Sequence, residues 1–328
     1  MWRKVRRRTA MRVYFKNLAK IIMKLKRTGL KLRDLGTAPF AIETAPEHIK
    51  LHTITLATGK RGSGKSYFLA NLLSWLEFDR IIIVSPTYQS NYGQFKHLNI
   101  KDEDKLDPDQ PSVVEKIISK VEAERDDLLE YRQKLKLYNE LKKVCSHPDD
   151  LGEDKDTFWE YISRDGLRFV PPQHRWGGKK PKIAVFVDDA QSTAIFRNRR
   201  FLNLATRHRH IGAMPNDEAS IGLSLFIAVQ SYTAQGGGLP RSIRGNATHM
   251  ALWKTKNAKE LKLISEEFAG EVSPETFFKV YDYAMENGGE YPFLFIDLHK
   301  KPQHPSGFRA SYMNFITDIP TDASATGK

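Results

Sequence analysis

Residues 59–66 read Gly-Lys-Arg-Gly-Ser-Gly-Lys-Ser and match the pattern G-x-x-x-x-G-K-[ST] at every fixed position. In the preceding residues 51–58, apolar and polar side chains alternate and β-forming types are common, which predicts a strand. Residues 67–76 (YFLANLLSWL) predict an apolar helix. A strand, a glycine-rich loop and a helix in this order form the P-loop unit, which cradles phosphate groups. The candidate nucleotide contacts are Gly59, Lys60, Arg61, Gly62, Ser63, Gly64, Lys65 and Ser66.

The residue types of this segment suit a nucleoside triphosphate. Glycines let backbone N–H groups curl around phosphate oxygens, and the following helix presents its positive N-terminal end to them. In this interpretation Lys65 reaches the β- and γ-phosphates and Ser66 ligates Mg²⁺. The motif therefore predicts ATP as the nucleotide and Mg²⁺ as its metal.

Two carboxylates follow a second predicted strand. Residues 182–187 (KIAVFV) form a buried-strand pattern, and Asp188 and Asp189 come directly after it. We expect Asp188 to hold Mg²⁺ through water and Asp189 to orient and deprotonate the attacking water. The alternative is a pair of aspartates that only cap a following helix.

Further strands are predicted at residues 80–84, 223–229, 249–253 and 292–298. Gln230 follows the strand at 223–229, where a polar side chain lies beside the γ-phosphate and either senses it or positions water; the alternative is an ordinary polar residue at a strand end. Strands that alternate with helices around a P-loop predict an α/β fold with a mainly parallel sheet. Its active site lies at the carboxyl ends of the strands.

Arginines flank the Gln230 strand on both sides. Arg209 belongs to the segment Arg-His-Arg-His at 207–210, and Arg244 follows a glycine-rich stretch at 235–240. Arginines near a γ-phosphate sensor are candidates for a finger that acts on the nucleotide of a neighbouring subunit. They are also compatible with contacts to DNA phosphates or with a solvated surface.

The net charge of +13 is concentrated at one end of the chain. Residues 1–35 hold thirteen basic residues and one acidic residue, whereas the rest of the chain is almost neutral, with 39 basic and 38 acidic residues. Apolar positions recur within this arm at helical spacing, which predicts a basic amphipathic helix. We favour a phosphate-binding arm; the alternatives are contact with an anionic membrane or a partner, a transit peptide and a solvated extension.

The remaining organisation follows from charge and composition. Residues 36–316 are the expected P-loop domain, residues 317–328 a flexible tail, and residues 101–156 a charged helical insertion with a long helix at 113–144. The helix is expected to project or to form a hairpin; the alternative is a surface helix packed on its own domain.

No apolar run approaches the ~18–20 residues of a membrane span, and the N-terminus lacks a secretory apolar region. Cys145, the single cysteine, excludes an internal disulfide.

The order of these motifs resembles the FtsK–HerA superfamily, within it the poxvirus-type genome-packaging ATPases. The resemblance covers about residues 50–300 outside the insertion. It is carried by the segments GKRGSGKS, RIIIVSPTYQSN, IAVFVDDA, RHRHIG, LFIAVQSY, LPRSIRGNA and LWKTKNAKEL. The double aspartate and the strand that ends in Gln-Ser-Tyr are its more specific features. The insertion at 101–156 and the long segment at 212–222 that precedes the Gln230 strand set this chain apart from the family pattern.

The resemblance implies a homo-oligomeric ring that hydrolyses ATP to move double-stranded DNA into a preformed capsid, in the virion or at the site of virus assembly. By position it assigns Lys65 and Ser66 to nucleotide and Mg²⁺, Asp188 and Asp189 to the metal and catalytic acids, and Gln230 to the sensor. Arg244 is the first candidate for the finger in trans and Arg209 the second. The alternative is another DNA-pumping ATPase of this superfamily, from conjugation, plasmid partition or filamentous-phage assembly. No Asn-Lys-x-Asp signature of a GTPase is present.

Overall fold

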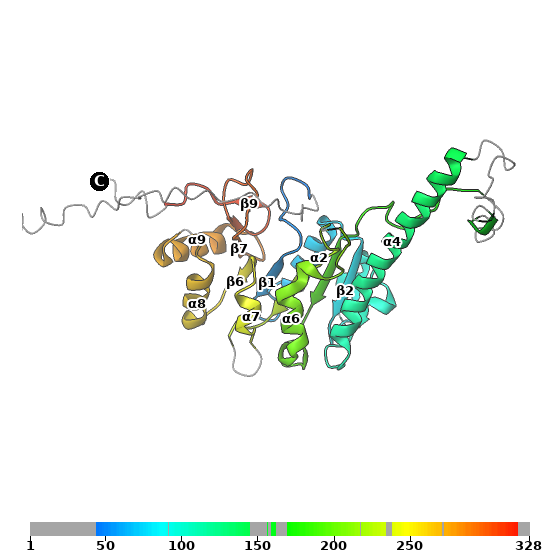
Figure 1. The fold of residues 1–328 in the computed structure, drawn as a ribbon. Helices are drawn as coiled ribbons and strands as arrows, with labels where there is room; N and C mark the ends of the chain where they lie inside the picture. The colour runs from blue at the N-terminus through cyan, green and yellow to red at the C-terminus, as the bar shows by residue number, and fades with distance from the viewer. Residues whose placement is uncertain are drawn as a thin grey trace, which may run out of the picture. The chain divides into compact units, whose positions relative to one another are not determined.

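A nine-stranded sheet with the order β3-β2-β4-β5-β1-β6-β7-β8-β9 organises the chain (Figure 1). This computed structural model describes residues 44–90, 92–144, 156, 159–161, 169–216, 218–233, 238–270 and 272–320. The predicted basic arm at residues 1–35 and residues 321–328 of the predicted tail lie outside the described residues.

Strands and helices alternate along the described chain as far as β6, after which come two helices and three strands. The strands are β1 Ile54–Thr58, β2 Arg80–Val84, β3 Lys105–Leu106, β4 Ile183–Val187, β5 Ser224–Val229, β6 His249–Trp253, β7 Phe293–Asp297, β8 Phe308–Ala310 and β9 Asn314–Phe315. The α-helices are α2 Lys65–Trp75, α3 Tyr92–Phe95, α4 Val113–Val144, α6 Arg199–Arg207, α7 Arg241–Arg244, α8 Ala258–Phe268 and α9 Pro274–Asn287. Short 3₁₀ turns are η1 Lys96–Leu98, η2 Asp102–Asp104, η5 Ile195–Arg197 and η6 His208–His210.

The sheet is parallel from β3 through β6, and β7, β8 and β9 add antiparallel strands at the other side. The predicted fold class, α/β with a mainly parallel sheet, is confirmed. The strands predicted at 80–84 and 249–253 agree with β2 and β6. Strand β1 begins at Ile54 and not at residue 51, because His52 has a left-handed backbone (φ 57°) that no extended strand accommodates.

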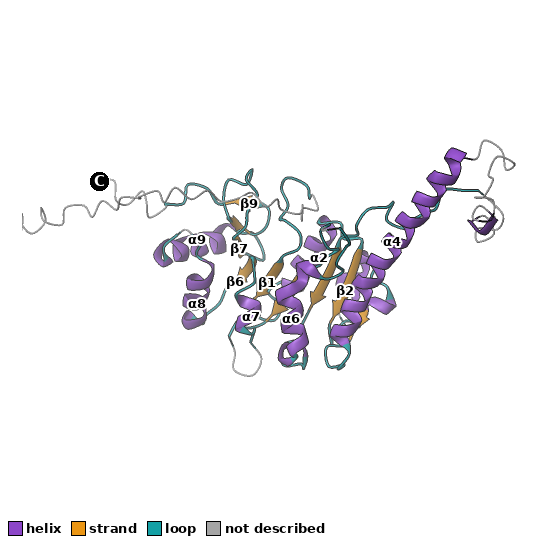
Figure 2. Ribbon diagram, in the orientation of Figure 1, coloured by secondary structure: helices purple, strands orange, loops and turns teal. Residues whose placement is uncertain are grey.

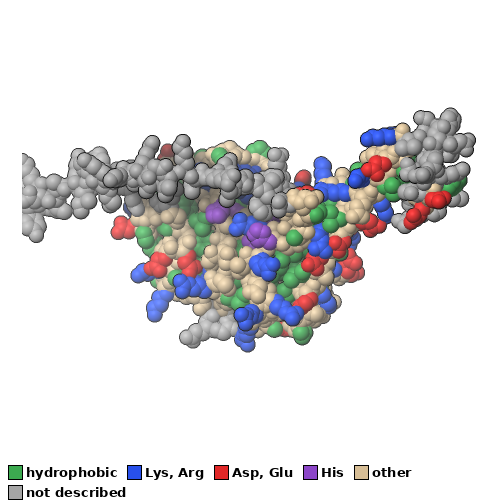
Figure 3. All heavy atoms as spheres, viewed as in Figure 1, with side chains coloured by type: hydrophobic (Ala, Val, Ile, Leu, Met, Phe, Trp, Pro, Cys, Tyr) green, Lys and Arg blue, Asp and Glu red, His purple; other side chains and the backbone are tan. Residues whose placement is uncertain are grey.

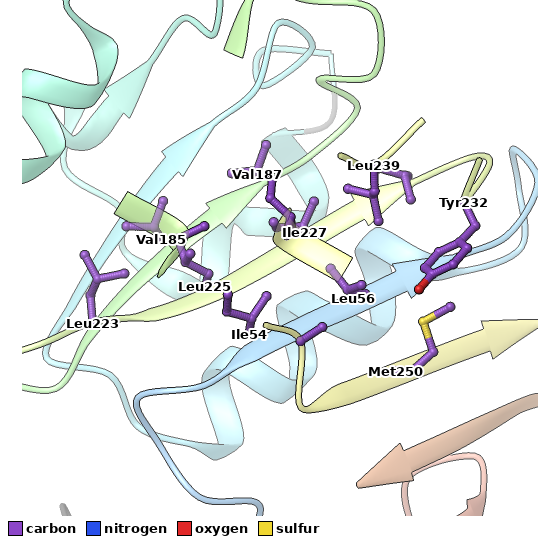
Figure 4. Close-up of a cluster of buried hydrophobic side chains, with 14 of the residues drawn as sticks. Ile54, Leu56, Val185, Val187, Leu223, Leu225, Ile227, Tyr232, Leu239 and Met250 are labelled. Atoms are coloured by element: carbon purple, nitrogen blue, oxygen red, sulfur yellow. The ribbon is translucent and has the colours of Figure 1, made fainter. Parts of the chain in front are cut away.

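Helices cover both faces of this sheet (Figure 2). One face packs against α2 and α3 through side chains such as Leu69, Leu72 and Phe95. The other face packs against α4, α6, α8 and α9, and Figure 4 shows its apolar side chains contributed by adjacent strands. Because successive residues of a strand point to opposite faces, the continuous apolar runs of the central strands fill both layers.

Helix α4 spans the predicted residues 113–144, but most of it does not project. Val114, Val121 and Leu128, which recur every seventh position, are fully buried in the core that lies between α4 and the sheet. The expectation of a projecting helix or hairpin is therefore wrong for this part of α4, and the alternative of a surface helix holds. The last turns leave that core, and Leu141 instead packs with Tyr161 in a small separate cluster.

A cluster of charged side chains attaches α4 to the sheet edge. Glu124, which is fully buried, accepts a hydrogen bond from Arg80 at 2.9 Å and one from the indole N–H of Trp176 at 2.8 Å. The same Arg80 bonds Asp104 at 2.8 Å, just before β3. Residues 101–106, predicted to begin the insertion, thus extend the sheet through β3.

The exposed surface of α4 carries basic and acidic side chains side by side (Figure 3). Among the residues that the structure describes, no helix is both long and apolar enough to cross a bilayer.

Acid is expected to weaken the fold through His52. Burial lowers the pKa of this imidazole to about 4, below the 6.5 of an exposed histidine, and charges on His208, Lys180 and Arg209 act in the same direction. As pH falls below 6.5, His52 binds a proton in the unfolded chain but not in the folded chain, so the free energy of unfolding decreases. From pH 7 to pH 5 this loss amounts to about 2 kcal/mol. Urea unfolding at the two pH values measures it.

The matched variant is His52→Asn, because asparagine tolerates the left-handed backbone of this position and does not titrate. The pH dependence of its unfolding free energy should be flatter by that amount. Equal losses in the variant and the unchanged protein would assign the acid sensitivity to other groups.

Candidate nucleotide-binding site

The loop between β1 and α2, residues 59–66, is here called the phosphate loop. Gly62 and Gly64 have φ values of 76° and 92°, which only glycine adopts freely. Gly64 is the N-cap of α2, so the positive end of that helix faces the loop. A Cβ atom on Gly59 would lie 2.7 Å from Cβ of Trp253, so this glycine lets the loop pass close to β6. The backbone conformation or the close packing of the loop thus explains why each of these three positions is glycine.

Lys65 lies under the phosphate loop. Its ammonium donates hydrogen bonds to the carbonyl oxygens of Gly59 at 2.7 Å and Lys60 at 2.9 Å. Burial lowers the pKa of this ammonium, and the nearby carboxylates of Asp188 and Asp189 act in the opposite direction. An ammonium has three protons, so one remains for a phosphate oxygen.

Ser66 and Asp188 meet although 122 positions separate them in the chain. The Ser66 hydroxyl donates a hydrogen bond of 2.8 Å to Oδ1 of Asp188. Asp188 is fully buried, and its Oδ2 has no hydrogen-bond partner among the described residues. Burial raises the pKa of this carboxyl to about 6. A cation would pair with this orphaned oxygen and restore the ionised form, so the pair fits the predicted Mg²⁺.

Two protein groups are what a P-loop site offers to Mg²⁺. The described residues contain no group of three or more His, Cys, Asp or Glu side chains that could hold a metal ion by themselves. Phosphate oxygens and water have to complete the coordination of a metal bound here.

Asp189 and Gln230 lie next to each other at the carboxyl ends of β4 and β5. The Gln230 amide lies 3.5 Å from Oδ1 of Asp189, a long hydrogen bond. Asp189 has a left-handed backbone, φ 50°, directly after the end of β4. Strained residues of this kind collect at functional sites. The structure thus brings together Lys65, Ser66, Asp188, Asp189 and Gln230, as the sequence predicts.

A cleft of about 640 Å³ opens between the phosphate loop and Asp189, a volume typical of small-molecule sites. Its lining also includes residues for which the sequence predicts no role: Tyr67, Thr87, Ser90, Gln94, Glu290 and Tyr291. Tyr291 is half exposed and its Cβ lies 3.5 Å from the Cβ position of Gly64, so its ring offers a stacking surface beside the loop.

The two predicted finger arginines do not join this group. The guanidinium of Arg244 forms an ion pair of 3.1 Å with Glu267 of α8 and lies 5.0 Å from the ring of Tyr232. Only 13% of its side chain is exposed. A finger in trans acts on the nucleotide of a neighbouring subunit, so this role of Arg244 stays a prediction. Within its own chain the ion pair packs α7 against α8.

Arg209 is exposed, but it lies near the amino ends of the parallel strands, whereas the phosphate loop lies at their carboxyl ends. It belongs to η6, which precedes β5, and the carbonyl of its neighbour His208 accepts a hydrogen bond from Leu223 at the start of that strand. The phosphate loop follows the carboxyl end of β1. Within one chain Arg209 is therefore far from the predicted site.

No family model and no curated protein matches this chain. Among solved structures it is similar to B204, the DNA-packaging ATPase from Sulfolobus Turreted Icosahedral Virus, with 16% identity over 76% of this chain and 93% of that chain and a TM-score of 0.37. It is also similar to the pCW3 conjugation coupling protein TcpA, with 14% identity, 77% and 60% coverage and a TM-score of 0.33.

A third similar structure is the cytoplasmic domain of the Thermomonospora curvata Type VII secretion ATPase EccC, with 13% identity, 81% and 28% coverage and a TM-score of 0.38. Identities and TM-scores this low carry no weight for the activity. What the chain does has to follow from the residues of its own site.

Proposed function

We propose that this protein is a Mg²⁺-dependent ATPase. The observation that carries the proposal is the hydrogen bond from Ser66 to Asp188, which joins the phosphate loop to a buried acid. Asp189 and Gln230 stand beside that pair, and a cleft large enough for a nucleotide lies in front of it. A glycine-rich turn without catalysis needs none of these partners.

The residues divide the work of hydrolysis between them. Backbone N–H groups of the phosphate loop and the Lys65 ammonium bind the phosphate oxygens. Ser66 and Asp188 hold Mg²⁺, which when bound neutralises negative charge on the β- and γ-phosphates. Asp189 accepts the proton of the attacking water, and Gln230 orients that water by hydrogen bonding. The proton therefore ends on the Asp189 carboxylate, from which solvent removes it.

We further propose that hydrolysis drives a ring of identical subunits along double-stranded DNA and packages a viral genome into a capsid. Support comes from the order of the sequence motifs and from the basic arm at residues 1–35, which suits a polyanionic partner. This assignment places the protein in the virion or at the site of virus assembly, with a capsid component as a second partner.

Duplex DNA is expected to stimulate ATP turnover, because a translocating motor completes its cycle only when it engages its track. The measurement is phosphate release with and without duplex DNA, and with single-stranded DNA of equal length as the control. Displacement of a third strand from a DNA triplex reports movement directly. If duplex DNA leaves the rate of ATP turnover unchanged at every salt concentration, the proposed ATPase activity stands and the proposed DNA motor is excluded. Binding to empty capsids then separates packaging from conjugation and other DNA-pumping functions.

A further inference from the structure

The segment that follows β5, residues 230–233, is here called the Gln230 loop. It is fixed from two sides by side chains for which the sequence predicts no role. On one side is Gln191, two positions after Asp189, and on the other is Glu260, in the first turn of α8.

Glu260 gathers three donors on one carboxylate oxygen. Its Oε1 accepts hydrogen bonds from the Ser231 hydroxyl at 3.0 Å and the Thr233 N–H at 3.1 Å, and also from the N–H of Tyr232. The side chain is buried, with 7% of the residue exposed. Asn257 caps α8 by accepting from the Glu260 N–H at 3.2 Å, so the helix end holds Glu260 in place. Hydrogen bonds to a charged acceptor are roughly twice as strong as neutral ones.

Gln191 holds the start of the same loop. Its Oε1 accepts from the N–H of Gln230 at 2.7 Å and from that of Ser231 at 3.3 Å, and its amide donates to the Ser231 carbonyl at 3.3 Å. These contacts connect the Gln230 loop to the turn that carries Asp188 and Asp189. With its backbone bound on both sides, Gln230 keeps only its side-chain rotations, and its amide faces Asp189.

We propose that Glu260 is a positioning residue for ATP hydrolysis. By holding the backbone of residues 231–233 it keeps the Gln230 amide at the place where the attacking water is oriented. Burying a carboxylate is costly, and ending a strand does not require one. A fixed carboxylate with three donors is a preorganising device of the kind that supports catalytic groups. The proposal rests on the ATPase function proposed above.

The test is the steady-state kinetics of Glu260→Ala and Glu260→Gln. Glu260→Ala should lower kcat by about 10- to 100-fold, because small displacements of a catalytic group cost this much. Glu260→Gln keeps an acceptor oxygen and should lose less. The affinity for a non-hydrolysable ATP analogue should stay within about twofold in both, since no phosphate contact is removed. The matched control is Glu266→Ala, an exposed glutamate on the same helix.

A double-mutant cycle separates positioning from a general structural role. If Glu260 acts through Gln230, then Glu260→Ala should add almost nothing to the defect of Gln230→Ala. Equal losses in both backgrounds, or an unchanged kcat in the single variant, would overturn the proposal. If Glu260→Ala does not fold, as thermal melting shows, Glu260→Gln carries the cycle. A native protein without ATPase activity would instead contradict the proposed function itself.

Discussion

Lys65→Ala should reduce ATP hydrolysis by at least about 10³-fold and weaken ATP binding. Lys65 is the buried cation whose ammonium bonds the carbonyls of Gly59 and Lys60 and stands next to the site of the phosphates. Its removal takes away the charge that the β- and γ-phosphates need and loosens the phosphate loop. Phosphate release and equilibrium binding of a fluorescent ATP analogue measure the two effects.

Lys142→Ala is the control for the loss of one positive charge, because Lys142 is exposed near the end of α4. Its turnover should equal that of the unchanged protein. Thermal melting has to show that Lys65→Ala is folded. A folded Lys65→Ala protein that still hydrolyses ATP at the native rate would show that the phosphate loop is not the catalytic site.

Asp189→Asn should separate binding from hydrolysis. Asparagine has the same shape and accepts the left-handed backbone at this position, so the turn is retained. The variant loses the carboxylate that accepts the proton from water, which should lower kcat by about 10²- to 10⁴-fold. ATP should still bind, because Ser66 and Asp188 remain paired. Single-turnover hydrolysis and binding of radiolabelled ATP give the two values.

Asp188→Asn is the informative comparison for that experiment. It removes the charge that suits Mg²⁺, so the Mg²⁺ dependence of nucleotide binding should change in this variant and not in Asp189→Asn. Normal turnover by Asp189→Asn would reverse the assignment of the two acids and move the proton acceptor elsewhere.

Local patterns were sufficient to predict the elements that carry the site. The apolar runs at 80–84 and 249–253 correspond to whole strands, and the glycine spacing at 59–66 anticipates the two positive φ angles of the loop. The proximity of Asp188 to Ser66 followed from a general rule: parallel strands bring their carboxyl ends to the same edge of a sheet. These predictions depend on neighbours in sequence or on strand direction.

The remaining features depend on partners that a pattern does not name. Arg244 suits a finger by sequence, and its ion pair with Glu267 exists only because α7 packs against α8. The seven-residue repeat of α4 is compatible with a projecting helix or a helical hairpin as well as with a helix packed on the sheet. The spacing of Asn257 and Glu260 does suggest a helix start, but not that the carboxylate binds the Gln230 loop.

The place of β5 between β1 and β4 has a consequence for synthesis on the ribosome. The phosphate loop and the metal acid are made before β5, yet β5 supplies the hydrogen bonds that space their strands. A nascent chain that ends before Ser224 thus has both halves of the site and no strand to align them. Competence to bind Mg²⁺ with nucleotide is therefore acquired only after β5, Ser224–Val229, has been synthesised.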